Sequence, residues 1–308
     1  MGERTRIARY FAPLAAAEAG SFSLTDDAAV LTLPAGQQLV VTTDSVIESI
    51  HVLPGASAQQ FAQKLMRRNL SDLAAMGATP WHYTLNIHTP VHLPPSWFAE
   101  FAATLASEQK AFGLTLIGGD STSGGNSIHC TLTCFGLLDG AALRRNGATI
   151  GDDVYVSGTV GDAAYALHLL QQKQPVDDSL AARYHCPEPR LALSQMLHGI
   201  ATSTIDISDG LLADIAQLCT ASGCGASITR DLIPKRAGTD WDFALSGGDD
   251  YELCFTAPVT QRNTIQEIAK KLNLPLTRIG SMTQGSGVTL YDTNGAEIPI
   301  TQTGFEHS

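Results

Sequence analysis

Residues 205–223 read IDISDGLLADIAQLCTASG, and this stretch shows how the chain is built. Ile205 to Ser208 predict a short strand, and Asp209 to Ser222 predict the helix that follows it. Gly223 then occupies the position at which a left-handed glycine commonly ends a helix. A strand that passes through a few polar residues into a helix is typical of an α/β protein.

Strands and helices alternate in the same way on the N-terminal side of this stretch. Strands are expected at Gln37–Thr43, ending at Asp44, and at Tyr83–His88, Leu114–Ile117 and Ile128–Leu138. Helices are expected from Ser57 onward and over Pro95–Phe112. Ser57 and Gln60 form a capping-box pattern at the start of the first helix. The apolar face of that helix is expected to contain Phe61, Leu65, Leu73 and Met76.

A second set of elements follows a polar segment at residues 144–153. Its strands are expected at Val154–Ser157, Tyr251–Thr256 and Leu276–Gly280, and its helices at Gly161–Leu170, Pro187–Gly199 and Val259–Leu272. We therefore expect two α/β domains, residues 1–140 and 141–308, which agrees with a length of 308 residues.

Composition excludes several classes of protein. The chain is 44% hydrophobic and carries a net charge of −11, so a basic nucleic-acid or anionic-membrane surface is not expected. No apolar run approaches the roughly 20 residues of a spanning helix, and no signal-peptide pattern follows Met1. The six cysteines are dispersed without a C-x-x-C motif, which indicates reduced thiols and a cytoplasmic location.

The unusual feature of the sequence is a set of six acidic clusters beside Gly, Ser or Thr, expected at strand ends or on loops. They are Asp26-Asp27, Thr42-Thr43-Asp44, residues 69–72, residues 118–120, residues 206–209 and residues 247–250. Each cluster alone could be a turn or a helix cap, and Asp209 could simply cap its helix. If several converge, their mutual repulsion favours Mg²⁺ bound between carboxylates and a phosphorylated ligand.

The motifs that are missing support the same chemistry. The sequence has no G-x-x-x-x-G-K-[ST] loop, no H-R-D or D-F-G kinase set, and only six lysines. Metal ions, and not a P-loop lysine, would then balance the charge of a bound nucleotide. Gly118 and Gly119 could allow backbone N–H groups to approach phosphate closely, although a tight turn would also need them.

Four motifs in order resemble the thiamine-monophosphate kinase family, which belongs to the superfamily of aminoimidazole ribonucleotide synthetase. They are Asn69–Ala78, Ile117–Asp120, Ile205–Leu211 and Ala244–Leu253. The resemblance extends over nearly the whole chain. It implies two α/β domains, each a mixed sheet flanked by helices, with an N-terminal domain for ATP, Mg²⁺ and dimerisation and a C-terminal domain completing the site. It also implies a homodimer that phosphorylates thiamine monophosphate with ATP.

The resemblance further implies roles for individual residues. Mg²⁺ ions would be held by Asp27, Thr42, Thr43, Asp44, Asp72, Asp120, Asp206 and Asp209, of which Asp44, Asp120 and Asp209 would be catalytic. ATP would contact Gly119, Asp120, Arg145 and Ser208, and thiamine phosphate would contact His51, Asp249 and Phe305. His51, Arg145 and Phe305 could instead be ordinary structural or surface residues.

The chain departs from the family pattern in three loops. The G-I-G-D-D loop reads Ser23 to Asp27, the E-G-x-H-F segment reads Glu48 to Val52, and G-G-E-D reads Gly247 to Asp250. If the first loop needs positive φ angles, Ser23 and Thr25 would strain it. Two alternatives remain open: another ATP-using enzyme of the superfamily, or a non-catalytic nucleotide- or metal-binding protein.

Overall fold

The structure, a computed structural model, describes residues 2–300 and residue 304. The chain divides into two compact units. Unit 1 contains the residues up to Leu73 together with Ala78–Gly140, and unit 2 contains Ala74–Gly77 and the residues from Ala141 onward. Within the described ranges, no helix is both long and apolar enough to cross a membrane.

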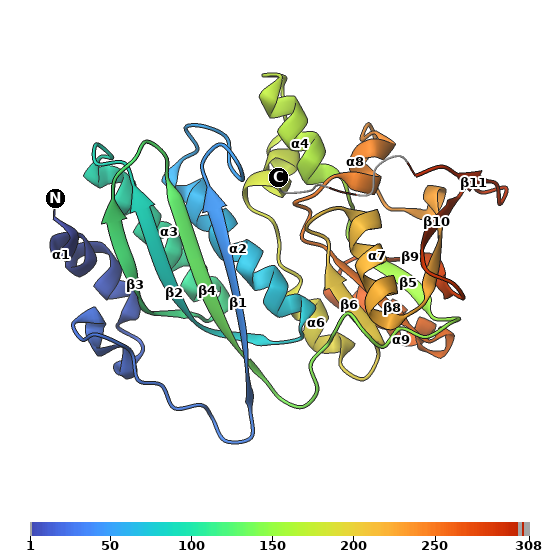
Figure 1. The fold of residues 1–308 in the computed structure, drawn as a ribbon, viewed down its shortest axis with the longest axis horizontal. Helices are drawn as coiled ribbons and strands as arrows, with labels where there is room; N and C mark the ends of the chain where they lie inside the picture. The colour runs from blue at the N-terminus through green and yellow to red at the C-terminus, as the bar shows by residue number, and fades with distance from the viewer. Residues whose placement is uncertain (1, 301–303, 305–308) are drawn as a thin grey trace. The chain divides into compact units, whose positions relative to one another are not determined.

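Unit 1 is built on a four-stranded mixed sheet (Figure 1). The order across the sheet is β1 (Gln38–Ile47), β4 (His129–Leu138), β2 (Thr79–Thr89) and β3 (Thr115–Ser123). β4 is antiparallel to both of its neighbours, whereas β2 and β3 are parallel. Helices α2 (Ala58–Ala75) and α3 (Pro95–Phe112) pack on the sheet, and short helical turns between Glu3 and Leu24 lie against β3.

The start of α2 confirms the capping box. The Ser57 amide donates to Gln60 Oε1 at 3.0 Å, and the Gln60 amide donates to Ser57 Oγ at 3.1 Å. Phe61, Leu65 and Leu73 are fully buried, as the periodicity predicts, but α2 ends at Ala75, one residue before Met76. α3 has the predicted bounds and ends at Gly113, whose φ of 74° is left-handed.

Two strands of unit 1 continue past the acidic residues at which they were expected to end. β1 runs on from Asp44 to Ile47, and β3 runs through Gly118, Gly119 and Asp120 to Ser123. Both are edge strands, and their backbone ladders to β4 and β2 continue through these positions. Polar side chains fit there because an edge strand leaves one side open to water. Asp44 and Asp120 therefore stand on strands, and Asp72 stands within α2, so none of the three lies on a loop.

Unit 2 contains a seven-stranded mixed sheet. Its order is β11 (Glu297–Ile298), β10 (Gly287–Tyr291), β7 (Gly225–Thr229), β9 (Leu276–Thr283), β5 (Asp153–Ser157), β8 (Leu253–Ala257) and β6 (Ser203–Asp206). Neighbours are antiparallel except β7 and β10, which are parallel. The prediction of two α/β domains with mixed sheets is therefore confirmed.

Helices cover both faces of this second sheet. Val154 and Val156 of β5 pack in one apolar core with α7 (Leu211–Ser222). Tyr155, between them, packs in a second core with α6 (Leu191–Leu197) and α9 (Arg262–Leu272). Successive strand residues point to opposite faces, so a strand buried on both sides belongs to a three-layer arrangement.

The predicted helix at residues 209–222 begins two residues late. α7 starts at Leu211 with Gly210 before it, and Asp209 does not cap it. Gly223 ends the helix with a φ of 67°, as predicted. The predicted helix at residues 187–199 is shortened to α6, because prolines at 187 and 189 keep the preceding backbone out of helical geometry. β7, β10, α5 (Asp178–His185) and α8 (Trp241–Ser246) carry no strong periodic signal and were not predicted.

Candidate active site

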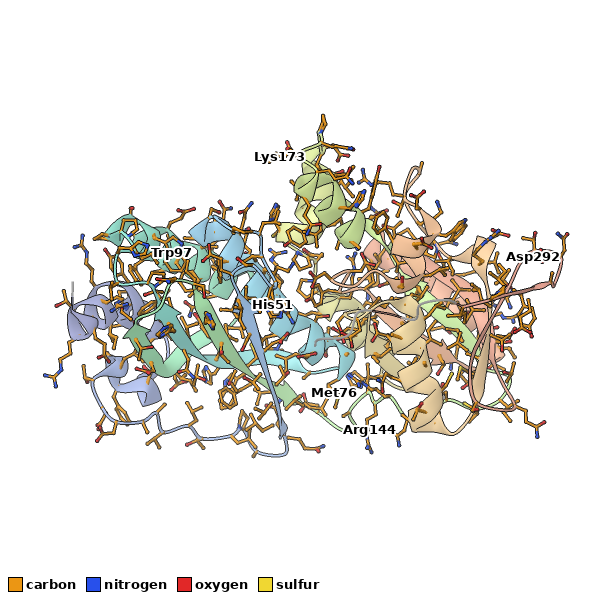
Figure 2. The ribbon with its side chains drawn as sticks, turned by 45° about the horizontal axis from the view of Figure 1, so that its top comes forward. His51, Met76, Trp97, Arg144, Lys173 and Asp292 are labelled. Carbon is orange, nitrogen blue, oxygen red and sulfur yellow. The ribbon has the colours of Figure 1, made fainter. Side chains whose placement is uncertain are left out.

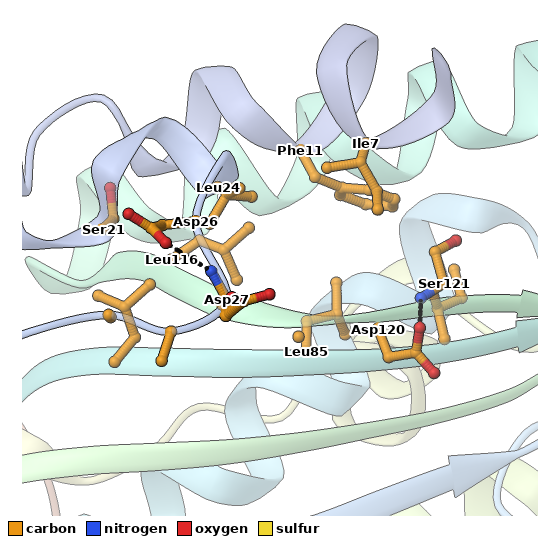
Figure 3. Close-up of a pocket in the computed structure, with 16 residues that line it drawn as sticks. Ile7, Phe11, Ser21, Leu24, Asp26, Asp27, Leu85, Leu116, Asp120 and Ser121 are labelled. Carbon is orange, nitrogen blue, oxygen red and sulfur yellow. Dashed lines mark hydrogen bonds between the residues drawn. The ribbon is translucent and has the colours of Figure 1, made fainter. Parts of the chain in front are cut away.

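A pocket at the β3 edge of unit 1 brings together three of the predicted site residues. Asp27, Gly119 and Asp120 line it, with Ile7 and Phe11 forming part of an apolar wall (Figure 3). The acidic residues come from two segments, the loop after the N-terminal helical turns and strand β3. An apolar wall beside carboxylates is suited to a ligand that has both an apolar and a charged part.

Gly119 brings the β3 backbone close to its neighbour. Its φ is 147°, and a Cβ at this position would lie 1.9 Å from the Leu85 carbonyl oxygen on β2. Any side chain would therefore push the two strands apart. The sequence predicted that glycine here would let the backbone approach a phosphate. In the structure, Gly119 lets β3 approach β2.

The loop that leads to Asp27 is strained. Phe22, Ser23 and Leu24 have φ values of 50°, 54° and 57°, which non-glycine residues rarely adopt. Each such residue costs roughly 1–3 kcal/mol. The expected strain is therefore present at Ser23, but Thr25 has a φ of −103° and is relaxed. The Thr25 hydroxyl instead donates to the Phe22 carbonyl at 2.7 Å and helps to close the turn.

A second group of candidate residues lies between β1 and α2. The Thr42 hydroxyl donates to Asp72 Oδ2 at 2.6 Å. Asp44 accepts from Arg68, with Nε 3.0 Å from Oδ2 and Nη2 3.2 Å from Oδ1. Hydroxyl and carboxylate oxygens are the hard donors that Mg²⁺ prefers, so this donor set fits the metal chemically.

Thr43 and His51 have other surroundings. Thr43 points to the opposite face of β1 from Thr42, where its hydroxyl donates to the Leu132 carbonyl at 3.2 Å. It also accepts from the Thr133 hydroxyl at 3.0 Å. His51 lies in the turn after β1, and its Nδ1 accepts from the Ile47 amide at 3.1 Å (Figure 2).

The two groups of unit 1 are separated by the width of the sheet. Asp44 pairs with Leu132, Leu132 pairs with Leu85, and Leu85 pairs with Gly119. Three strand spacings correspond to about 14 Å. Over residues 2–300 and 304, no three His, Cys, Asp or Glu side chains come together as a metal ion would need. Within unit 1 the acidic candidates therefore form two groups, because β1 and β3 are opposite edges of the sheet.

In unit 2, Asp206 is the last residue of β6, and the loop from there to α7 carries Ser208 and Asp209. Its shape depends on a residue that was not predicted, Asp214 in the first turn of α7. Asp214 Oδ2 accepts three backbone N–H groups, from Ser208 at 3.1 Å, Asp209 at 3.2 Å and Gly210 at 3.1 Å. The Asp214 side chain is buried, and burial, together with the charges of Asp206 and Asp209, raises its pKa to about 8.

The loop that contains Asp249 packs directly on the Asp209 loop. The Asp249 amide donates to the Ser208 carbonyl at 2.9 Å, and the Tyr251 amide donates to the Ile207 carbonyl at 2.8 Å. A Cβ on Gly248 would lie 2.5 Å from the Ser208 oxygen, so the approach requires glycine. Asp249 itself has a φ of 70° and accepts from the Tyr251 hydroxyl at 2.8 Å. Unit 2 thus brings Asp206, Ser208, Asp209 and Asp249 together.

The two remaining candidates are Arg145 and Phe305. The Arg145 side chain is exposed. The backbone carbonyl of its neighbour Arg144 accepts from the Thr204 amide at 2.8 Å, so the segment runs beside β6. Phe305 lies outside the described residues. Gly304 lies against the Asp209 loop, because a Cβ there would be 2.8 Å from the Asp209 carbonyl oxygen.

Family models match both units. The model of the AIR synthase related protein N-terminal domain matches residues 25–138, and that of the C-terminal domain matches residues 149–293. The fold and the site therefore define a two-domain protein of the AIR synthase related class.

Individual relatives narrow this class. The thiamine-monophosphate kinase of Haemophilus influenzae is 38% identical to the chain. The aligned region covers all of this chain and 98% of that relative. The crystal structure of thiamine-monophosphate kinase from Stenotrophomonas maltophilia K279a has 39% identity and a TM-score of 0.82, covering 89% of this chain and 91% of that one. AaThiL complexed with AMPPCP and TMP is 26% identical with a TM-score of 0.78, covering 94% and 97%. The chain belongs to the thiamine-monophosphate kinase family and is an enzyme of that family.

Proposed function

We propose that this enzyme transfers the γ-phosphoryl group of ATP directly onto the phosphate of thiamine monophosphate, giving thiamine diphosphate and ADP. The observation that carries the proposal is the pocket in which Asp27, Gly119 and Asp120 meet an apolar wall. AaThiL, solved with AMPPCP and TMP, supports the choice of the two substrates. Family membership over the full chain supports the reaction class.

The chain's own residues would position the reactants. Oxygen donors from three places would hold magnesium. They are Asp27 and Asp120 in the pocket, Thr42, Asp44 and Asp72 between β1 and α2, and Asp206 and Asp209 in unit 2. Thr43 would be a further donor. Magnesium, when bound, would offset the charge of the phosphates and leave them free to meet in line. The acceptor phosphate is already ionised, so no strong general base is needed.

Substrate contacts follow from the same assignment. Gly119, Asp120, Arg145 and Ser208 would contact ATP, and the Arg145 guanidinium is exposed and suited to fork onto phosphate oxygens. His51, Asp249 and Phe305 would contact thiamine monophosphate. The Tyr251 hydroxyl fixes the Asp249 carboxylate, which supports a positioned side chain there.

We also propose that the enzyme is a homodimer that pairs through the sheet of unit 1. Leu39 and Val41 on edge strand β1 are 46% and 54% exposed, although both are large and apolar. They point to the face opposite Thr42 and Asp44, which bond to α2. Exposed apolar side chains on a sheet face suit an interface between copies of a chain.

The function is tested by product analysis. The purified chain is incubated with ATP, Mg²⁺ and thiamine monophosphate, and the products are identified by mass spectrometry. Thiamine diphosphate and ADP in equal amounts are expected. ADP and free phosphate without thiamine diphosphate would contradict the proposal and would favour another ATP-using enzyme of the class. Nucleotide binding without any turnover would favour a non-catalytic binding protein.

A further inference from the structure

The carboxylate of Asp44 already has a cationic partner in the protein. Arg68 on α2 reaches it with two nitrogens, Nε to Oδ2 at 3.0 Å and Nη2 to Oδ1 at 3.2 Å. The Arg68 side chain is 10% exposed and that of Asp44 is 31% exposed. A two-pronged pair of this kind is directional and engages both carboxylate oxygens.

The pair has a consequence for metal binding if Asp44 is a magnesium ligand, a role that rests on the proposed function. Each carboxylate oxygen can accept more than one partner, so geometry alone does not exclude a metal. Charge does oppose it, because a divalent cation on the same carboxylate would face the Arg68 guanidinium at close range. Only part of Asp44 is exposed to water that could screen the two cations.

We propose that Arg68 is a resident counter-ion of Asp44 that competes with Mg²⁺ for this carboxylate. Arg68 orients Asp44 and balances its charge when no metal is present. Metal binding requires the guanidinium to move away from at least one oxygen or to share it. The pair thereby raises the metal concentration that the site needs, and Arg68 is a positioning residue that acts through Asp44.

The neighbouring residue supplies a matched control. Arg67 forms the same kind of fork with Glu108 of α3, with Nε 2.8 Å from Oε2 and Nη2 3.3 Å from Oε1. Its side chain is 14% exposed, close to the value for Arg68. Glu108 is not a candidate metal ligand. Arg67→Met and Arg68→Met therefore each remove a forked ion pair from adjacent positions of one helix, with the carboxylate left by Arg67→Met the more buried of the two.

The test measures metal binding directly on the full-length protein. Mn²⁺ is titrated and the free ion is followed by electron paramagnetic resonance, with Mg²⁺ competition to report the affinity for Mg²⁺. Arg68→Met is expected to tighten binding about fivefold, the change that corresponds to a typical ion pair. Arg67→Met is expected to bind as the wild type does. Equal or weaker binding by Arg68→Met would overturn the proposal.

Two further variants keep the test decisive. Arg68→Lys retains the charge but loses the fork, and its affinity is expected to lie between those of the wild type and Arg68→Met. If Arg68→Met does not fold, an Arg68→Lys variant that binds no more tightly than the wild type overturns the proposal. In an Asp44→Asn background, Arg68→Met should no longer tighten binding, and a persistent effect would show that Arg68 does not act through Asp44.

The outcome is separable from that of the proposed function. Formation of thiamine diphosphate by the wild type tests the reaction, whereas the titration tests the ion pair without any substrate. Tighter metal binding by Arg68→Met with no thiamine diphosphate from the wild type would refute the reaction alone. Thiamine diphosphate formation with unchanged metal binding in Arg68→Met would refute the counter-ion alone.

Discussion

One buried acidic side chain, Asp214, shapes the loop that carries Asp209. Three N–H groups point at its Oδ2, and an asparagine would offer them a single oxygen while leaving a buried NH2 group in need of a new acceptor. Asp214→Asn is expected to lower the rate of thiamine diphosphate formation about tenfold or more, a size common for groups that orient ligands. Steady-state kinetics at saturating ATP and thiamine monophosphate measures this rate.

Asp152 is the control for this effect. It is also buried, and it accepts from the Thr149 amide at 2.9 Å and the Thr202 hydroxyl at 2.7 Å. It lies at the opposite end of the strands from Asp206, because neighbouring Asp153 pairs with Ala257 while Asp206 pairs with Leu253. Asp152→Asn should affect stability but leave the rate of thiamine diphosphate formation at saturating substrates unchanged. Equal losses of that rate in both variants would refute the role of Asp214.

Asp250 makes stability depend on pH. It is buried and accepts from the amides of Gly161 and Ala163. Burial is the main cause that raises its pKa, from 3.8 to about 7, while the positive charge of Arg183 opposes the rise. Between these values the folded protein keeps a proton that the unfolded chain has released, so the free energy of unfolding falls as pH rises.

Asp250→Asn removes this titration and is expected to flatten the pH dependence. The loss of slope is at most about 1.4 kcal/mol per pH unit, the effect of one proton. Urea unfolding of wild type and variant at several pH values measures it. An unchanged slope would mean that Asp250 does not hold a proton in the folded state.

At the scale of elements, two adjacent glycines on β3 differ in what they tolerate. A Cβ on Gly119 would lie 1.9 Å from the Leu85 oxygen, whereas one on Gly118 would lie 3.8 Å from Thr84 Cγ2. Gly119→Ala is expected to lower the free energy of unfolding by more than about 2 kcal/mol, because β2 and β3 must separate. Gly118→Ala is expected to change it by less than about 0.5 kcal/mol. Chemical unfolding compares the two, and similar losses would contradict the tight pairing.

Elements with strong local signals could be predicted from the sequence. The capping box of Ser57 and Gln60 and the apolar periodicity of α2 act within a few residues, and α3 likewise has the predicted bounds. β7 reads Gly225 to Thr229 with small residues, and its strand state comes from pairing with β9 and β10. Such pairing joins segments far apart in the chain and leaves little local trace.

The residues of the candidate site likewise include some that the sequence identifies and some that only the fold brings together. The family motifs mark Asp27, Asp120 and Asp209, because the residue types themselves carry the chemistry. The Arg68–Asp44 pair could not be predicted, since it joins a helix and a strand that only the fold brings together. Asp214 is similar, because its three N–H partners converge only when the preceding loop is folded.

For the whole molecule, the exposed face of β1 predicts association. Val41→Lys would place a charge in the proposed interface and is expected to convert a dimer into a monomer, halving the mass measured by light scattering after size-exclusion chromatography. Val91→Lys is the control, because Val91 is 79% exposed and follows β2 in a turn away from the β1 face. A wild type that is already monomeric would contradict the homodimer.

The six cysteines bear on the conditions for these measurements. In the described part of the chain they form no disulfide bond, and five of them are buried. Burial raises the pKa of the Cys130, Cys134 and Cys254 thiols, which makes them poor nucleophiles. We therefore expect that reducing agent does not change the fold or the activity.

The most direct test of the central claim follows the transferred group. ATP labelled with oxygen-18 on its γ-phosphoryl oxygens is supplied with Mg²⁺ and thiamine monophosphate, and the products are weighed by mass spectrometry. Transfer of the γ-phosphoryl group to thiamine monophosphate predicts that the terminal phosphoryl group of thiamine diphosphate carries the label and that free phosphate does not. Label found in inorganic phosphate, with thiamine monophosphate left unchanged, would contradict the account.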